Sequence, residues 1–178
     1  MHLNRFDRAR QAWTTYDWQA WLYHGKTSWL QLAWFLVLLG VLAFLDQSTQ
    51  IVWLVPPFAA TLTILLLLPR SPIAQPFTVV IGSTLGALAG TVASLFVHGP
   101  IYAALVASVM VLVLPLLKVY HPPGVALSLY PLLLHTSLAF PFVVVLPFTL
   151  VSVITCAGLS RIFKTWPEYP LPIKRTGS

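Results

Sequence analysis

The strongest constraint on this chain is a series of long apolar runs separated by short polar breaks. Of its 178 residues, 58% are hydrophobic and only 8% are charged, whereas a soluble domain carries about 25% charged residues. Because such a chain cannot cover a water-facing surface, we predict a single-domain, all-α protein that crosses a membrane several times. The apolar runs fall at 28–45, 51–68, 77–97, 101–117, 123–134 and 140–160.

Two of the six runs differ from the others. A spanning helix needs about 20 residues, and the first, third, fourth and sixth runs reach that length with their flanks. The second run opens with Pro56-Pro57 and the fifth follows Pro122-Pro123, and prolines break helices. We therefore predict four long transmembrane helices and two half-helices, which start at Pro57 and Pro123.

The two halves of the chain resemble each other. The segment "V-P-P-F-A-A" at 55–60 aligns with "H-P-P-G-V-A" at 121–126, and "P-F-T-V-V" at 76–80 aligns with "P-F-V-V-V" at 141–145. Each half then has three crossings, so the second copy would be inverted. We predict an inverted repeat of 28–97 and 101–163, a design that places broken helices near the bilayer midplane. The alternative is two short, tilted or kinked spans.

The basic residues indicate the orientation in the membrane. If all six runs cross, every Lys and Arg outside them falls on one side, and the positive-inside rule makes both termini cytoplasmic. The net charge of +6 then suits anionic headgroups rather than nucleic acid. We expect an interfacial amphipathic helix at 1–27, or a tail packed on the bundle, and a cytoplasmic tail at 164–178. A bacterial cytoplasmic membrane is the expected location.

The proline breaks predict the functional site. A helix N-terminus carries partial positive charge and free N–H groups, and two such ends that face each other would bind a small anion. His121 would bind this anion or gate the site by protonation, or else it is a structural histidine bonded to a backbone carbonyl. The predicted substrate-binding residues are His121, Pro122, Pro123, Gly124, Pro56, Pro57, Phe58, Ser83 and Thr84, and the predicted entrance residues are Arg70, Gln75 and Lys118.

Small and polar residues add further expectations. Gly82, Gly86 and Gly90 recur at intervals of four and predict a smooth helix face. Close packing between the repeats is the favoured interpretation, and a dimer contact or pore-facing backbone are the alternatives. Threonine and serine hydroxyls would meet the solute or bond back to their own helices. Arg70 is expected to bond the last carbonyls of the first half-helix or to attract anions. No metal-ligand spacing, nucleophile–base pair or ATP-binding loop occurs, so we expect no metal, no cofactor and no enzymatic activity.

Two motifs carry a family resemblance. The stretch "S-P-I-A-Q-P…I-G-S-T-L-G-A-L-A-G" at 71–90, followed by "H-P-P-G" at 121–124, resembles the HPP family of small integral membrane proteins, over residues 28–163. The resemblance implies about four spans, and it implies nitrite transport because plastid and cyanobacterial members have been linked to it. The chain departs from the family pattern at Ile73, Phe77-Thr78 and Ser83-Thr84, where Leu, Arg-Asn and Gly-His are usual.

These observations lead to one functional hypothesis with two alternatives. We expect a channel or transporter for a small monovalent anion, with nitrite as the leading candidate, and a dimer if the chain associates with itself. The first alternative is the transport of another small solute or a cation. The second is a membrane assembly or sensory protein that transports nothing.

Overall fold

The computed structural model describes residues 28–49 and 51–171, and within these ranges the regular secondary structure is entirely helical. The all-α prediction is therefore confirmed for this part of the chain. The predicted interfacial helix at 1–27 and the last residues of the tail lie outside the described residues. In chain order the elements are α2 (Trp29–Ser48), α3 (Pro56–Leu67), the 3₁₀ turn η2 (Pro72–Ala74), α4 (Pro76–Ala93), α5 (Pro100–Leu116), α6 (Pro122–Leu127), α7 (Tyr130–Leu134), the π-helical turn η3 (Pro141–Val145) and α8 (Leu146–Ile162).

Three of the described helices are long and apolar enough to cross a membrane. They are α2, α4 and the continuous helix formed by η3 and α8, with 20, 18 and 22 residues. The fourth predicted span is α5, whose 17 residues extend about 26 Å, slightly less than a hydrocarbon core of about 30 Å. The repeat relation between the two halves stays a prediction.

Prolines decide where most of the helices begin. A proline occupies the first position of α3, α4, α5 and α6. This position suits proline because its ring fixes a helical φ and the missing N–H would have had no partner within the helix. Helix α2 instead begins with a capping box, in which the backbone N–H groups of Gln31 and Ser28 each bond to the other residue's side chain.

The end of α5 is sharply defined. Lys118 has a φ of 58°, the N–H of Val119 donates to the carbonyl of Leu114, and the N–H of Lys118 donates to the carbonyl of Pro115. This pattern is a Schellman motif, which usually places glycine in the left-handed position. Val119 and Leu114 also belong to one small apolar cluster. The motif ends α5 and directs the chain back into the bundle.

Helix α8 starts with a wider turn. The N–H of Leu146 donates to the carbonyl of Pro141, five residues earlier, which is the π-helical pattern. Pro147 follows in the sequence and lacks the donor that a regular helix would use there. The π turn therefore lets one long helix run from Pro141 to Ile162 in spite of this internal proline.

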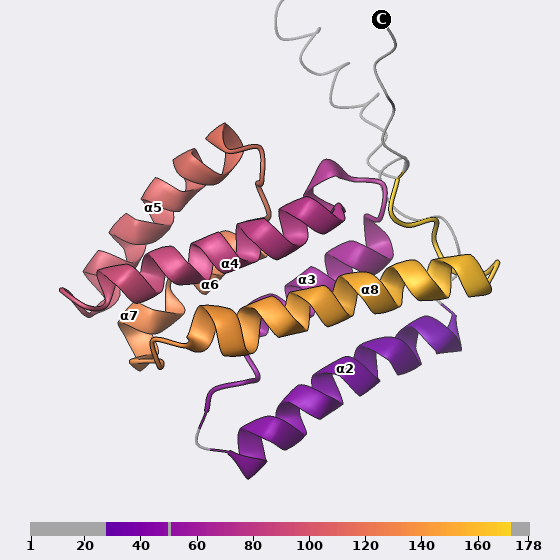
Figure 1. Ribbon diagram of the computed structural model, residues 1–178, viewed down its shortest axis with the longest axis horizontal. Helices are drawn as coiled ribbons and strands as arrows, with labels where there is room; N and C mark the ends of the chain where they lie inside the picture. Colours follow the sequence, from indigo (N-terminus) through magenta and orange to yellow (C-terminus); the bar gives the residue numbers. More distant parts are fainter. Residues whose placement is uncertain (1–27, 50, 172–178) are drawn as a thin grey trace, which may run out of the picture.

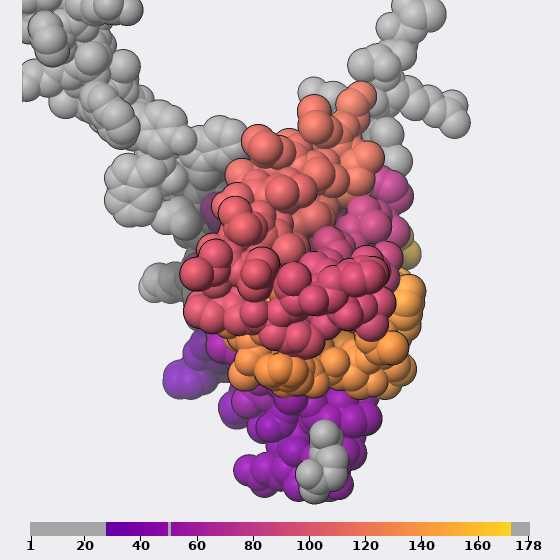
Figure 2. Space-filling model, turned by 90° about the vertical axis from the view of Figure 1, so that its left-hand side faces the viewer, coloured from indigo at the N-terminus to yellow at the C-terminus, as the bar shows by residue number. Residues whose placement is uncertain are grey.

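The helices form a layered bundle with the two short helices inside it. Figure 1 shows α4 and α8 running in opposite directions across the middle, with α2 on one side and α5 on the other. Seen from one end, the long helices stack in the order α5, α4, α8 and α2 (Figure 2). The start of α2 and the end of α8 lie at the same end, which we call the terminal end. There Nε1 of Trp34 donates to Oγ1 of Thr155 at 2.9 Å.

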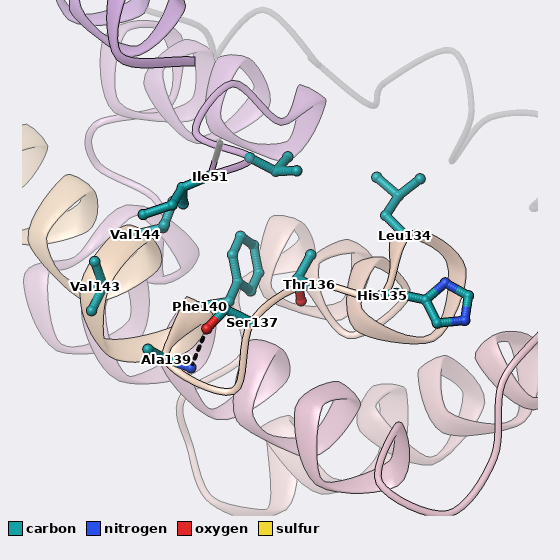
Figure 3. A pocket seen from close by; sticks show the side chains of 10 residues that line it. Ile51, Leu134, His135, Thr136, Ser137, Ala139, Phe140, Val143 and Val144 are labelled. Atoms are coloured by element: carbon teal, nitrogen blue, oxygen red, sulfur yellow. Dashed lines mark hydrogen bonds between the residues drawn. The ribbon is translucent and has the colours of Figure 1, made fainter. Parts of the chain in front are cut away.

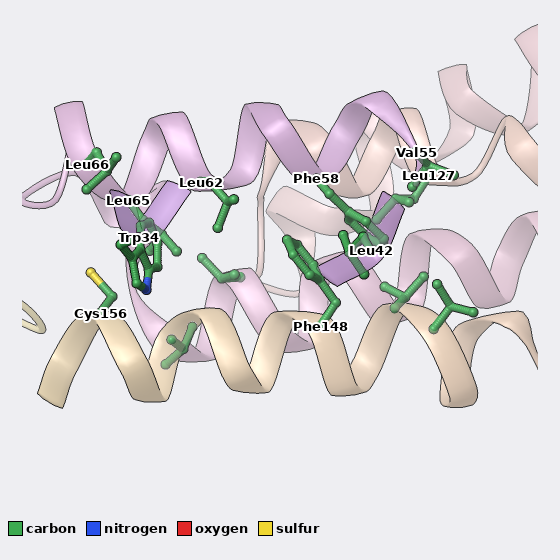
Figure 4. Packing of buried hydrophobic residues seen from close by; sticks show 14 of the residues in the cluster. Trp34, Leu42, Val55, Phe58, Leu62, Leu65, Leu66, Leu127, Phe148 and Cys156 are labelled. Carbon is green, nitrogen blue, oxygen red and sulfur yellow. The ribbon is translucent and has the colours of Figure 1, made fainter. Parts of the chain in front are cut away.

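The main apolar core joins α3 to α8. The rings of Phe58 and Phe148 stack with centroids 4.0 Å apart, and Figure 4 shows them facing each other from these two helices. Leu62 and Leu65 continue the same face of α3 and are fully buried. Although α3 has only 12 residues, this core holds it firmly inside the bundle.

Candidate functional site

Two short helices begin inside the bundle, as the proline pairs predict. Val55 and His121 precede α3 and α6 and have extended backbones, with φ and ψ of −118° and 135° for Val55 and −131° and 111° for His121. Extended geometry is expected for a residue before proline. Both helices start at the first proline of the pair, one residue earlier than predicted. The chain therefore enters each half-helix as an extended segment.

The glycine face of α4 fixes the position of the second half-helix. A Cβ atom on Gly82, Gly86 or Gly90 would overlap the carbonyl oxygens of Val119, Gly124 and Ser128, respectively. The segment 119–128 therefore runs alongside α4 in the same direction, with backbone against backbone. Packing between the two predicted repeats was the favoured interpretation of these glycines, and the contacts confirm that they pack.

The contact with Gly82 also shows how far along α4 His121 lies. A Cβ on Gly82 would lie 3.2 Å from Cβ of His121, so the two residues are at one level. Gly82 is six residues beyond the first residue of α4, which corresponds to about 9 Å along the helix. His121 is fully buried, with 0% exposure. Its ring therefore lies inside the bundle, well away from the terminal end of α4.

His121 connects three separate parts of the chain. Its Nε2 atom lies 3.0 Å from Oγ1 of Thr61 on α3, and its Nδ1 atom lies 2.8 Å from the carbonyl oxygen of Ile73 in η2. The hydroxyl of Thr61 also lies 3.1 Å from the carbonyl oxygen of Pro57. His121 therefore bonds a backbone carbonyl, as the structural interpretation expects, and whether it also binds a solute stays a prediction. The sequence did not indicate that the carbonyl would be that of Ile73.

This network can accommodate either protonation state of His121. Because a carbonyl only accepts, Nδ1 must carry a proton. In the neutral ring Nε2 accepts the single proton of the Thr61 hydroxyl. In the charged ring Nε2 donates to Thr61, whose proton then goes to the carbonyl of Pro57. Every ring nitrogen has a partner in both states.

The N-termini of the half-helices offer fewer donors than we expected. Prolines occupy the first two positions of α3 and of α6 and have no N–H. The next N–H groups are already used, because Phe58 donates to the carbonyl of Val55 and Gly124 to that of His121. These helix ends therefore retain their partial positive charge, but they lack the free N–H groups that we predicted would bind the anion. The side chains of His121 and Thr61 are the remaining polar groups at this point.

The predicted substrate-binding residues lie on two sides of the half-helices. His121, Gly124, Phe58 and Ser83 are buried in the interior. The two proline pairs instead border an open groove of about 490 Å³ between α3 and the α6–α7 segment. The rest of the groove is lined by Ala60, Ile64, Ala126, Leu129 and Tyr130. The half-helices are thus adjacent, with an apolar outer side and a polar contact within.

The two predicted hydroxyl residues of α4 behave differently. Thr84 donates to the carbonyl of Val80 at 2.7 Å, so it bonds back to its own helix. Ser83 is fully buried, and its hydroxyl has no hydrogen-bond partner among the described residues. It follows Gly82, which contacts His121. Ser83 is therefore the predicted α4 residue that is still able to bond a solute.

The predicted entrance residues are not grouped around one opening. Arg70 lies 3.8 Å from Glu168, and both side chains are largely exposed. The side-chain NH₂ group of Gln75 is already hydrogen-bonded, because Nε2 donates to the carbonyls of Pro69 and Ser71 at 3.0 Å. Lys118 is exposed at the end of α5. Arg70 thus faces a carboxylate rather than the last carbonyls of α3.

A second cavity lies at the end of the bundle opposite the terminal end. It measures about 200 Å³ and includes residues 134–137 and Phe140. Figure 3 shows Thr136 and Ser137 between His135 and Phe140. Beside it, the rings of His135 and His98 stack with centroids 4.3 Å apart. Both histidines are exposed.

These features define a helical membrane protein with two half-helices joined by a buried histidine. The chain belongs to the HPP family, since the sequence model described as "HPP, transmembrane region" matches residues 22–170. This membership suggests a role related to membrane transport. No curated protein and no solved structure matches the chain.

Proposed function

We propose that this protein conducts or transports a small monovalent anion across a cytoplasmic membrane, with nitrite as the leading candidate. The observation that carries the proposal is the buried bond between His121 and Thr61, made where α3 and α6 begin. Membership of the HPP family supports transport. The helix ends add positive potential at this point, which favours an anion.

The donors for the anion would come from side chains. The imidazole N–H of His121 and the hydroxyls of Thr61 and Ser83 are suited to the oxygens of nitrite. Ser83 supports this role because its buried hydroxyl has no partner among the described residues. The backbone N–H groups of the proline-capped helix ends do not take part. We therefore propose a site built from hydroxyls and imidazole rather than from free helix amides.

The charges support an assignment of the end of the bundle that faces the cytoplasm. Lys164 follows α8 at the terminal end, and Arg70 lies on the connection between α3 and α4. The positive-inside rule favours the terminal end as the cytoplasmic one. The anion would then pass between the opposite end, near His98 and His135, and the cytoplasm.

A neutral small solute is the second candidate. The groove along both proline pairs is lined almost entirely by apolar side chains, and the helix ends have no free N–H in their first turns. These two features favour an uncharged solute over a charged one. A cation is the weaker possibility, because no acidic residue occurs in α3, α4, α5, α6 or α7.

A flux assay distinguishes these candidates. The purified protein is placed in liposomes, and the uptake of nitrite, nitrate, chloride and urea is compared with that of protein-free liposomes. The anion proposal expects nitrite to enter faster than urea and faster than in the protein-free control. Uptake of urea alone would favour the neutral-solute candidate. No accelerated uptake of any solute would contradict a transport function.

A further inference from the structure

The segment after α8 does not extend away from the bundle. Residues 163–171, which we call the C-terminal strap, fold back over the terminal end. Trp166 and Tyr169 are buried, with 4% and 2% exposure, and the ring of Trp166 packs edge-to-face on Trp34 with centroids 5.5 Å apart. The strap therefore covers the end of the bundle that α2 and α8 share.

Polar contacts help to hold the strap in place. The N–H of Tyr169 donates to Oγ of Ser160 at 2.9 Å, and the N–H of Leu171 donates to Oε1 of Gln75 at 3.1 Å. A further contact is the exposed pair of Glu168 and Arg70, which is screened by solvent. Gln75 is thus the point at which the strap meets the connection between α3 and α4.

Gln75 also shapes this connection. Its Nε2 atom donates to the carbonyls of Pro69 and Ser71, which flank one side of η2. The carbonyl of Ile73, within η2, accepts from Nδ1 of His121. One amide side chain therefore holds the strap with its oxygen and the connection with its nitrogen. The connection in turn holds the ring of His121.

The docked strap contains polar atoms that undocking would satisfy. Nε1 of Trp166 and the hydroxyl of Tyr169 are buried and have no hydrogen-bond partner among the described residues. Such groups favour states in which water reaches them. At the same time, His121 is completely buried, so a solute can reach it only after part of the protein moves. The strap is the cover whose removal gains hydrogen bonds.

We propose that Gln75 is a positioning residue that couples the C-terminal strap to His121, so that the docked strap closes the solute site at the terminal end and undocking opens it. The part of this proposal that concerns solute access rests on the proposed transport function. The coupling itself does not, because it is a mechanical link between described residues. Strap docking and solute flux must therefore be measured separately.

Strap docking is measured with a spin label on Lys164→Cys. Lys164 is exposed and the native Cys156 is fully buried, so the label is confined to the strap. We expect Gln75→Ala to increase the mobility of the label, while Ala at the exposed Gln47 of α2 leaves it unchanged. Because coupling is reciprocal, His121→Ala should also increase this mobility. An unchanged spectrum in both Gln75→Ala and His121→Ala would overturn the coupling.

Closure is tested with Arg70→Cys/Glu168→Cys and a short, reversible thiol cross-linker. These two positions face each other across the strap and the connection. We expect cross-linking to reduce nitrite uptake about fivefold, near the lower end of usual coupling strengths, and a reductant to restore it. In each single cysteine variant, treatment with the cross-linker should leave the uptake at the value that the same variant shows before treatment. Unchanged uptake after complete cross-linking would overturn the closure.

The two proposals can fail separately. If the unmodified protein moves no nitrite, the transport proposal fails and the spin label still decides the coupling. Tyr169→Phe is an additional test, because this substitution preserves the packing of the ring. Because it removes an unpartnered hydroxyl, it should make the label less mobile and slow the uptake. A more mobile label in this variant would contradict the argument that the orphan hydroxyl favours undocking.

Discussion

Nε2 of His121 lies 3.0 Å from Oγ1 of Thr61, and this contact joins two half-helices whose residues are 60 positions apart in the chain. The contact is buried and joins the N-cap residue of α6 to the second turn of α3. Since Thr61 is the sixth residue of α3 and His121 precedes α6, the N-terminal turns overlap side by side. The two helix ends therefore do not simply point at each other across a gap.

The first prediction concerns this contact. Thr61→Val keeps the shape of the side chain and removes the hydroxyl, which leaves Nε2 of His121 buried without its partner. We expect a loss of about 1–3 kcal/mol in the free energy of unfolding and slower nitrite uptake. Thr61→Ser should retain most of both properties, because it keeps the hydroxyl. Equal stability and uptake in the valine and serine variants would show that the hydroxyl has no role.

The second prediction concerns the packing of α4 on the second half-helix. In Gly86→Ala the new methyl group would overlap the backbone carbonyl of Gly124. We expect destabilisation of about 1–3 kcal/mol, as is usual for overpacked interiors, measured by denaturant unfolding in micelles. Gly40→Ala is the matched control, since nothing lies within 4 Å of the added atom. If both variants unfold at the same denaturant concentration, the proposed register of α4 is wrong.

The third prediction uses the left-handed residue that ends α5. An L-residue in this conformation costs about 1–2 kcal/mol, and glycine loses about 0.5–1 kcal/mol through its greater freedom in the unfolded chain. Lys118→Gly should therefore stabilise the protein by about 0.8 kcal/mol, the difference between the midpoints of these ranges. Lys118→Ala removes the same charge without relieving the strain and should not stabilise. If both variants were stabilised by the same amount, the loss of the Lys118 charge would explain the effect instead.

The fourth prediction is the orientation in the membrane. His98 and Lys164 are exposed near opposite ends of the bundle, and Cys156 is buried, so single cysteines at these two positions can be labelled selectively. We expect an impermeant thiol reagent to label His98→Cys in intact cells. Lys164→Cys should react only after permeabilisation. The reverse pattern would place both termini outside and contradict the positive-inside argument.

The features that could be predicted from the sequence are those with a local physical cause. The two proline pairs start helices, each one residue earlier than predicted, because a proline ring acts on its own turn of the chain. Gly82 and Gly86 predict close packing because a residue without Cβ lets another backbone approach. Long-range partners could not be derived in this way. Nothing near His121 in the sequence indicates that Thr61 would be its partner.

One incorrect expectation also has a physical cause. We expected free N–H groups at the half-helix ends, although a proline pair removes two of the donors and the third is bonded internally. The cytoplasmic tail at 164–178 stays a prediction, but its described part packs on the bundle. Trp166 and Tyr169 were the signal that part of this tail is buried.

The most direct test of the account is nitrite uptake by liposomes that contain either the unmodified protein or His121→Ala. The helices packed on α6, namely α3, α4, α5 and α7, contain no acidic or basic residue. A change of uptake in a His121 variant can therefore not be assigned to a charged side chain on these neighbouring helices. We predict that uptake in His121→Ala is at least about tenfold lower than in the unmodified protein, or 1.4 kcal/mol, and that His98→Ala keeps its uptake. Equal uptake in all three proteins would contradict the central role of His121.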